Sequence, residues 1–414
     1  MRSVAIIALA ASLATLGAVG AARAIAHDSE HARIARGRYL AQAGDCAACH
    51  TAEGGRPYAG NRPVPTPFGT IYASNLTPDR ETGIGGWTDD DFWRAMHEGR
   101  RPNGDHLYPA FPYPWFTHLS HDDVLAIKAF LDTLPPVRQS VRAPDLPWPM
   151  SMRASVAGWN LLFFHEGELA SDPFRSAEWN RGQYLVEGLG HCSACHSPKN
   201  VLGGVKRDAR FEGGMGEGWF ATSLRRTPGE GLGDWSVDDI VTYLKSGANA
   251  RARALGPMAE VVEHSTQHLS DADLHAIAVY LKDLPGDDGK GRSQSASRDD
   301  ARLARGKLVY VDQCAGCHME NGEGIAGVFP PIKGNTAVHA HDVTSLARLV
   351  LDGARSARTP EKPEAFAMPG FADKLTDQEI ADVLTYVRES FGNQADAVSS
   401  STVAGERKTL RASR

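Results

Sequence analysis

The sequence predicts an all-α protein built from three similar helical units in series. A five-residue pattern, Cys-x-x-Cys-His, occurs three times along the 414 residues, and each copy lies between two amphipathic stretches of helical periodicity. The segments that join the units differ in length and composition, which indicates long irregular connections. Because 414 residues exceed what one ordinary core accommodates, several domains are expected.

The first helix of each unit leads into the five-residue pattern. The three copies read "RGRYLAQAGDCAACH" from Arg36, "RGQYLVEGLGHCSACH" from Arg181 and "RGKLVYVDQCAGCH" from Arg305. An internal repeat of this kind indicates one structural unit used several times.

The last helix of each unit follows a polar residue suited to an N-cap. These helices read "HLSHDDVLAIKAFLDTLP" from His118, "HLSDADLHAIAVYLKDLP" from His268 and "KLTDQEIADVLTYVRESFG" from Lys374. Ser120, Ser270 and Thr376 take the N-cap position, and acidic residues fill the first turn, where they favour the positive end of the helix dipole.

A shorter helix is expected between these two in each unit. Residues 87–99, "WTDDDFWRAMHEG", match residues 235–247, "WSVDDIVTYLKSG", and 343–353 form the third copy. Gly99 and Gly247 suit the C-terminal end of such a helix.

These patterns predict the boundaries of the domains. The first unit spans 31–138, the second 176–286 and the third 301–393, with a packed connection at 139–175, a flexible linker at 287–300 and a polar tail at 394–414. The connection carries Trp148, Trp159, Phe163 and Phe164, which we expect to pack between domains. The first two units should therefore form one body, and the third should be joined more loosely.

The N-terminus predicts export. In residues 1–26 one arginine precedes a long apolar run and two overlapping Ala-x-Ala sites, as in a secretory signal peptide; the alternative is an uncleaved membrane anchor. A periplasmic location follows, with at most peripheral attachment to the inner membrane through partners. The net charge of -6 argues against nucleic acid as a partner.

The chemistry of the chain lies in its cysteines. All six belong to the three patterns, so none remains for disulfides, and Cys-x-x-Cys-His is the attachment signal for c-type haem. The sequence predicts three covalently bound haem c groups in three cytochrome c-type domains. The attachment residues and the histidine ligands to iron are Cys46, Cys49 and His50; Cys192, Cys195 and His196; and Cys314, Cys317 and His318. A zinc site would need further ligands at matching spacing in each unit.

The sixth ligand to each iron is expected in the loop before the last helix, where a methionine would raise the reduction potential. This loop offers Met258 in the second unit and Met368 in the third. In the first unit Phe111 takes the position of Met368, and phenylalanine has no lone pair to donate.

Four residues could replace the missing methionine. They are Met96, His97, His106 and His118. Met96 aligns with a core leucine, whereas His97 aligns with Lys245 at an expected solvent position near the loop. We favour His97, which would give the first haem two imidazole ligands and a lower potential than its neighbours.

The chain resembles a known family over nearly its whole mature length. Residues 66–87, "TPFGTIYASNLTPDRETGIGGW", with 179–204 and 304–335, are similar to the three-haem cytochrome c subunits of bacterial membrane-associated dehydrogenases. These include alcohol, gluconate, sorbitol and fructose dehydrogenases. Met258 and Met368 match ligands of that family, whereas Phe111 departs from it and pairs with a histidine like His97 in some relatives.

The resemblance implies an electron-transfer subunit. Such a subunit takes electrons from a catalytic subunit of the quinoprotein, flavin or molybdenum type and passes them to ubiquinone or a terminal oxidase. The competing hypothesis is a haem enzyme or sensor, in which an open first haem binds peroxide or a small gas. The spin state of the first haem distinguishes the two.

Overall fold

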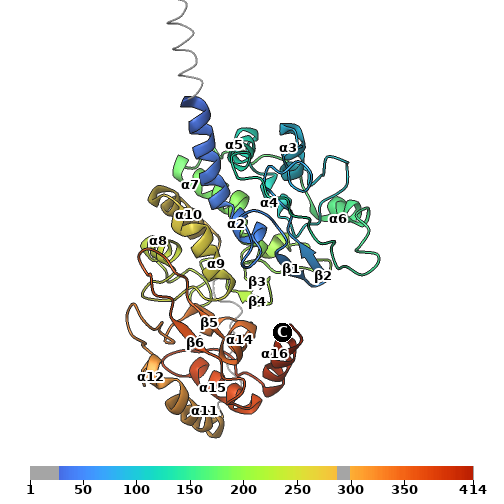
Figure 1. The fold of residues 1–414 in the computed structure, drawn as a ribbon. Coiled ribbons are helices and arrows are strands. Elements are labelled where there is room, and N and C mark those ends of the chain that lie inside the picture. The colour runs from blue at the N-terminus through green and yellow to red at the C-terminus, as the bar shows by residue number, and fades with distance from the viewer. Residues whose placement is uncertain (1–27, 287–298, 414) are drawn as a thin grey trace, which may run out of the picture.

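The computed structural model describes residues 28–286 and 299–413. The predicted signal peptide, 1–26, and nearly all of the predicted linker lie outside the described residues. Helices dominate the fold, and the first and second units lie together above the third in Figure 1. No helix among the described residues is long and apolar enough to cross a membrane.

Each unit contains the expected helices in the expected order. The first unit comprises a helix over 28–43, α2 Cys46–His50, β1 Pro63–Thr66, β2 Gly69–Tyr72, α3 Asp89–His97, α4 Tyr113–Phe116 and α5 His121–Leu131. The second unit comprises α7 Ala177–Tyr184, η1 Leu185–Leu189, η2 Cys192–Ala194, η3 Arg207–Ala209, β3 Gly214–Gly216, β4 Trp219–Ala221, α8 Val237–Ser246, α9 Pro257–His264, η4 Thr266–His268 and α10 Asp271–Asp283. The third comprises α11 Asp300–Gln313, α12 Ala315–His318, α13 Thr336–His339, α14 Thr344–Asp352, β5 Gly353–Arg355, β6 Ala367–Pro369 and α15 Asp377–Glu389.

The last helix of each unit starts where its N-cap predicts. The side chains of Ser120, Ser270 and Thr376 each accept a hydrogen bond from the backbone N–H three residues on. Each bond satisfies a donor that the first turn of a helix leaves without a partner.

A glycine sets the crossing of the first and last helices in every unit. A Cβ on Gly37 would lie 1.8 Å from the carbonyl oxygen of Ala126, and one on Gly182 would lie 1.9 Å from that of Ala276. In the third unit a Cβ on Gly306 would lie 2.2 Å from the backbone carbonyl oxygen of Asp382. The two helices therefore meet backbone to backbone, at a distance that excludes any side chain.

In the described residues, three short antiparallel strand pairs supplement the expected helices. β1 pairs with β2, β3 with β4, and β5 with β6. Their strands are three or four residues long and rich in glycine and proline, so they lack the alternating pattern by which strands are recognised in sequence. They satisfy backbone groups in the segments that flank the helices.

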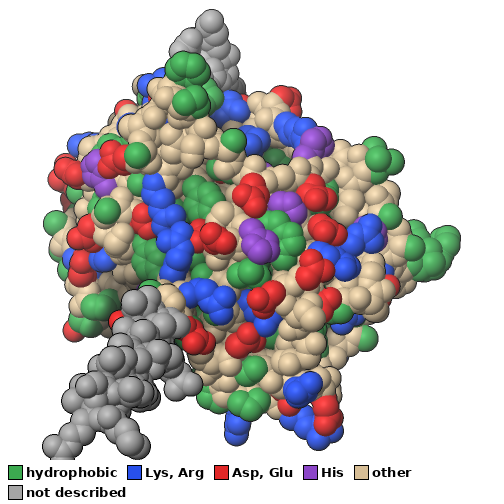
Figure 2. All heavy atoms as spheres, turned by 90° about the horizontal axis from the view of Figure 1, so that it is seen from above, with side chains coloured by type: hydrophobic (Ala, Val, Ile, Leu, Met, Phe, Trp, Pro, Cys, Tyr) green, Lys and Arg blue, Asp and Glu red, His purple; other side chains and the backbone are tan. Residues whose placement is uncertain are grey.

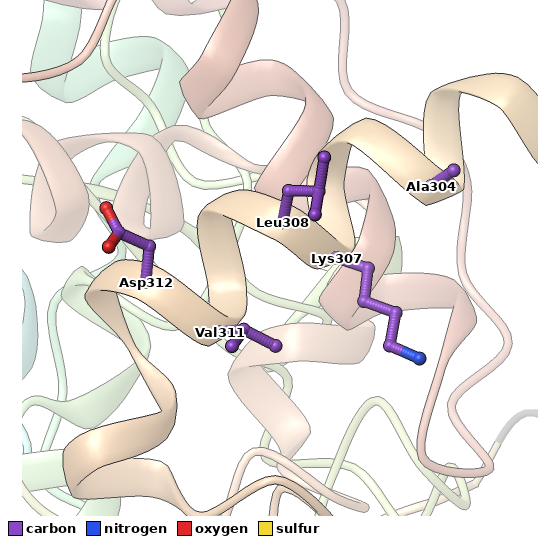
Figure 3. Close-up of a pocket in the computed structure, with 5 residues that line it drawn as sticks. All are labelled: Ala304, Lys307, Leu308, Val311 and Asp312. Carbon is purple, nitrogen blue, oxygen red and sulfur yellow. The ribbon is translucent and has the colours of Figure 1, made fainter.

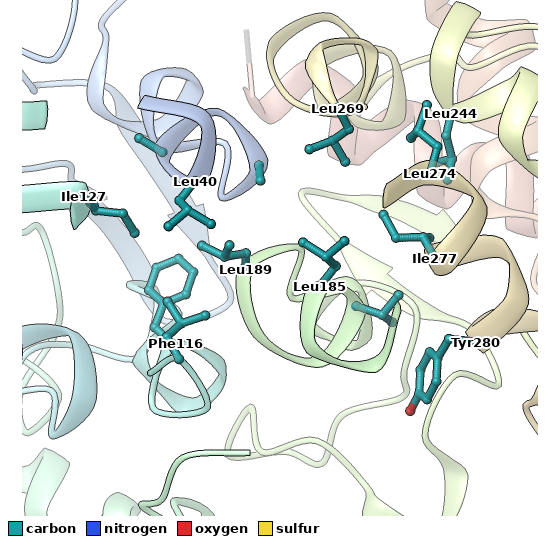
Figure 4. Packing of buried hydrophobic residues seen from close by; sticks show 14 of the residues in the cluster. Leu40, Phe116, Ile127, Leu185, Leu189, Leu244, Leu269, Leu274, Ile277 and Tyr280 are labelled. Carbon is teal, nitrogen blue, oxygen red and sulfur yellow. The ribbon is translucent and has the colours of Figure 1, made fainter. Parts of the chain in front are cut away.

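One hydrophobic core joins the first two units, as the sequence predicts. Leu40 and Ile127 of the first unit pack in the same cluster as Leu185, Leu189 and Ile277 of the second (Figure 4). The third unit has its own core, around Tyr310, Leu351 and Ile380. The first two units thus form one body by sharing apolar surface.

Polar contacts tie the third unit to the second more closely than a flexible linker suggests. The Ser345 hydroxyl accepts from the Phe220 N–H at 2.8 Å and donates to the Phe220 carbonyl at 3.0 Å. Arg253 donates to the Gly327 carbonyl at 2.6 Å. Composition alone could not reveal these contacts, because the residues that make them are distant in sequence.

The polar tail after Asn393 forms a helix, α16 Ser400–Ser413, which packs against α14 and α15. Three apolar residues in or near this helix are buried in the core of the third unit: Val398, Val403 and Leu410. A mean composition hides such a narrow apolar stripe, which is enough to attach a helix.

The expectation for the connection at 139–175 is wrong for one of its aromatic residues. Trp148 is 78% exposed, whereas Trp159, Phe163 and Phe164 are half-buried. The connection forms α6 Ser155–Phe163. Phe163 covers the backbone of Gly204, and Phe164 packs edge-on against Tyr113. On the face shown in Figure 2, acidic and basic side chains are intermixed and apolar side chains project at the edges.

Candidate functional site

Each Cys-x-x-Cys-His motif contains a tight helical turn. In the first unit this turn is α2, entered through Asp45 in the left-handed conformation at φ 54°. In the second unit the short helix η2 forms the start of the motif, Cys192–Ala194, and is entered through His191 at φ 34°. In the third unit α12 covers Ala315–His318 and follows directly on Cys314. The turn brings the two thiols and the imidazole of each motif to one place.

The three motif histidines are held in the same way. The Nδ1 atom of His50 lies 2.7 Å from the Ser74 carbonyl oxygen, that of His196 lies 2.6 Å from the Thr222 carbonyl oxygen, and that of His318 lies 3.0 Å from the Pro330 carbonyl oxygen. A carbonyl oxygen only accepts, so Nδ1 must carry the proton and Nε2 keeps its lone pair. This is the tautomer and orientation that a metal-ligating histidine requires.

Sequence reasoning did not find these three carbonyl groups. For two of these carbonyl groups the sequence does contain a repeated pattern. The segments "YASNLTP" around Ser74 and "FATSLRRTP" around Thr222 are similar and follow equivalent strand pairs. The third carbonyl lies in "VFPPIKGN", which shares no pattern with the other two segments.

Burial keeps the motif side chains uncharged. It lowers the pKa of the His50, His196 and His318 imidazoles, so that the neutral, ligating form prevails at neutral pH. Burial also raises the pKa of the Cys46 thiol to about 12 and that of Cys314 to about 11. A thioether to haem is likewise uncharged, so attachment adds no charge to these positions.

The surroundings of the cysteines fit a covalently attached haem. In each motif the first cysteine is half-buried and the second is exposed, and no disulfide joins any of them. A Cβ on Gly216 would lie 2.6 Å from the Cys195 sulfur, so the backbone of β3 passes close to this attachment point. A cysteine pair and a neutral imidazole on one turn are the donor set that c-type haem requires.

The two methionines lie on the predicted segments between the middle and last helices. Met258 is the second residue of α9 and packs, half-buried, against a small cluster of buried residues that includes Ala254 and Val262. Met368 is half-buried in β6, where its backbone pairs with Ala354 of β5. The segment expected to be a loop thus forms a helix around Met258 and a strand around Met368, and the assignment of both residues as iron ligands stays a prediction.

His97 is buried, so the expectation that it occupies a solvent position is wrong. It is 8% exposed and stacks on Trp93, with ring centroids 4.2 Å apart. Its Nδ1 lies 3.5 Å from the Thr117 hydroxyl, and its Nε2 lies 3.7 Å from a Glu166 carboxylate oxygen. The connection at 139–175 supplies Glu166, a neighbour of His97 that the helix pattern alone could not show.

The other candidates near Phe111 have protein partners. Phe111 packs on Phe116, with ring centroids 5.5 Å apart, and Met96 is buried in the shared core, as expected for a core residue. The Nδ1 atom of His106 lies 3.3 Å from the Asn160 amide nitrogen, and that of His118 lies 3.0 Å from the Glu187 carbonyl oxygen.

Contacts from the first unit to the second motif, and from the second unit to the first motif, link the two motifs. The segment that follows Phe111 lies on the second motif, where Trp115 donates to the Ser193 hydroxyl at 2.7 Å. Conversely, Arg62 donates to the Ala48 carbonyl in the first motif and pairs with Glu260 of α9 at 2.6 Å. The helix that carries Met258 is therefore tied to the first motif.

The second motif is also connected to the third unit. Thr222, which holds His196, lies two residues after Phe220, the residue that is hydrogen-bonded to Ser345 of α14. The second motif is thus joined to the first unit directly and to the third unit through the segment that holds His196.

Comparison with known proteins agrees with the motif chemistry. The sequence profile of the family described as Cytochrome c matches residues 34–135 and 303–390. The chain is 43% identical to the alcohol dehydrogenase (quinone), cytochrome c subunit of Gluconobacter oxydans, covering 97% of this chain and 87% of the relative. It is 41% identical to the gluconate 2-dehydrogenase cytochrome c subunit of Pantoea cypripedii, covering 95% and 93% of the two chains.

A third relative is larger. The chain is 43% identical to a subunit of the nicotinate dehydrogenase of Pseudomonas putida over 87% of its own length, but it spans only 30% of that protein. Together with the motif geometry, these similarities place the chain in the family of cytochrome c subunits of dehydrogenases, which are electron-transfer proteins with covalently bound haem c.

Proposed function

We propose that the chain is a three-haem electron relay between a catalytic dehydrogenase subunit and the respiratory chain. In this proposal the three cytochrome c domains span 31–138, 176–286 and 301–393, and each holds one haem c. The observation that carries the proposal is the threefold recurrence of a motif histidine with Nδ1 bonded to a backbone carbonyl. Iron that alternates between its ferrous and ferric states supplies the one-electron chemistry.

The names of the relatives support a catalytic dehydrogenase as the partner, and in this proposal it is of the quinoprotein, flavin or molybdenum type. The acceptor is ubiquinone or a terminal oxidase, and the protein acts in the periplasm, held peripherally at the inner membrane by its partners. Because the first two relatives named above are cytochrome subunits, and nothing around Phe111 favours peroxide or gas chemistry, the haem-enzyme alternative is not proposed.

Intact-mass spectrometry of the exported protein tests the number of haems. The expected mass is that of the processed chain plus three haem groups, because each cysteine pair lies beside its own histidine. A mass with only two haems would contradict the proposal.

Replacing Met258 or Met368 by alanine should remove the thioether ligand of one haem. The expected result of each change is the loss of one near-infrared methionine–iron band and a lower reduction potential for one haem, because the thioether stabilises ferrous iron. Near-infrared spectra and a redox titration measure both effects.

Met152→Ala is the matched control, since Met152 is an exposed methionine of the connection and is not among the candidate ligands. It should leave the bands and potentials unchanged. Unchanged spectra in both alanine variants would exclude Met258 and Met368 as ligands.

Replacing His97 by alanine tests the sixth ligand of the first haem. If His97 turns its Nε2 from Glu166 to the iron, the variant should show one high-spin haem at neutral pH while both methionine–iron bands remain. Electronic absorption and electron paramagnetic resonance spectra report the spin state.

His118→Ala is the control, because its Nδ1 is bonded to Glu187 and a similar histidine, His268, occurs in the second unit. Three low-spin haems with unchanged potentials in the His97 variant would exclude His97 and make Met96 or His106 the better candidate.

A further inference from the structure

The outer face of α11 carries an exposed apolar stripe. Leu308 is 73% exposed and Val311 is 54% exposed, and with Ala304 they follow one another at spacings of four and three residues. These side chains line a shallow groove together with Lys307 and Asp312 (Figure 3). The opposite face of the helix, with Leu303, Gly306 and Tyr310, is buried.

The stripe has the register of a two-stranded coiled coil. With Leu308 at position a, Ala304 and Val311 take position d, Lys307 takes position g and Asp312 takes position e. When two identical helices pair in parallel, position g of one helix faces position e, five residues further on, of the other. Lys307 and Asp312 are five residues apart and of opposite charge, so this face is complementary to itself.

In the first two units, the residue equivalent to Leu308 joins one unit to the other. Leu308 is equivalent to Tyr39 and Tyr184, because each lies two residues after the glycine at the helix crossing. Tyr39 donates to Asp273 of the second unit at 2.6 Å, and Tyr184 donates to Asp123 of the first at 2.7 Å. The first helix of a unit therefore contacts another unit through this position.

We propose that α11 pairs with α11 of a second copy of this chain. The two helices run parallel about a twofold axis, Leu308 and Val311 meet their counterparts, and two ion pairs form between Lys307 of one copy and Asp312 of the other. Because two exposed apolar residues on each side make a small interface, the dimer is weak and depends on concentration. The parallel arrangement places the third motif, 314–318, of both copies at the same end of the pair.

Charge reversal on the full-length, haem-loaded protein tests this pairing. Sedimentation equilibrium should show a wild-type dimer that dissociates on dilution. Lys307→Glu and Asp312→Lys should each raise the dissociation constant at least about tenfold, because each change puts like charges face to face twice. An equimolar mixture of the two variants should recover dimers. In a dimer of unlike copies the new glutamate at position 307 faces the new lysine at position 312, and the unchanged Lys307 and Asp312 face each other, so both g–e contacts join opposite charges.

Leu161→Asp is the control, because Leu161 is an exposed apolar residue on α6, away from the proposed interface. It should dimerise like the wild type, whereas Leu308→Asp should not. Three results would overturn the proposal: a wild type that stays monomeric at every concentration, single charge variants that dimerise like the wild type, or a Leu308→Asp variant that dimerises like the wild type. The first is also the result expected if a catalytic subunit, and not a second copy, covers this face.

Discussion

Replacing both Cys192 and Cys195 by alanine is expected to reduce the number of attached haems from three to two and to stop electron transfer through the chain. Without thiols the second haem has no covalent attachment, and His196 alone cannot retain it. The second motif contacts the first unit through Ser193, and the segment that holds His196 contacts the third through Phe220. Losing this haem should therefore interrupt the proposed relay at its centre.

The measurements are the intact mass and the rate at which the reduced catalytic subunit reduces a terminal acceptor through the cytochrome. The matched control is Ser193→Ala in the same motif, which keeps both thiols and loses only the hydrogen bond from Trp115. This control should retain three haems. If the double variant keeps a third haem, or passes electrons at the wild-type rate, the second motif is not part of the relay.

Replacing Gly182 by alanine is expected to destabilise the shared core of the first two units. The new Cβ would lie 1.9 Å from the Ala276 carbonyl oxygen and 2.6 Å from its carbonyl carbon. Because these are backbone atoms, no side-chain rotation relieves the clash, and α7 must move away from α10. Overpacking of this kind typically costs about 1–3 kcal/mol, and a clash with backbone should reach the upper end of that range.

Thermal and denaturant unfolding measure this loss. Gly158→Ala in α6 is the control, since a Cβ there meets no atom within 4 Å and alanine favours a helix more than glycine does. This control should unfold at the wild-type midpoint or slightly above it. A Gly182 variant as stable as the wild type would show that α7 and α10 do not cross as closely as the structure indicates.

The features that the sequence predicted well are local. A cap needs one residue and the backbone N–H three residues later, and the capping roles of Ser120, Ser270 and Thr376 are confirmed. The thiols and the histidine of each motif are likewise within five residues of one another. Short-range geometry makes such patterns readable without knowledge of the fold.

The features that the sequence missed depend on distant partners. His97 is buried and its neighbour Glu166 lies far along the chain, and the carbonyl group that holds His50 belongs to Ser74. Trp148 was expected to be packed, because hydrophobicity predicts burial only on average, and it is 78% exposed.

The sequence by itself therefore determined the local features of this protein: the three Cys-x-x-Cys-His motifs and the helical repeat that presents them. The tertiary structure decided which groups surround them. Tyr39 and Asp273, separated by 234 residues, meet only because the first two units share a core, and this pairing brings the second motif beside the loop of Phe111. The physical reason is that covalent attachment and capping act over a few residues, whereas burial and the approach of units follow from packing of the whole chain.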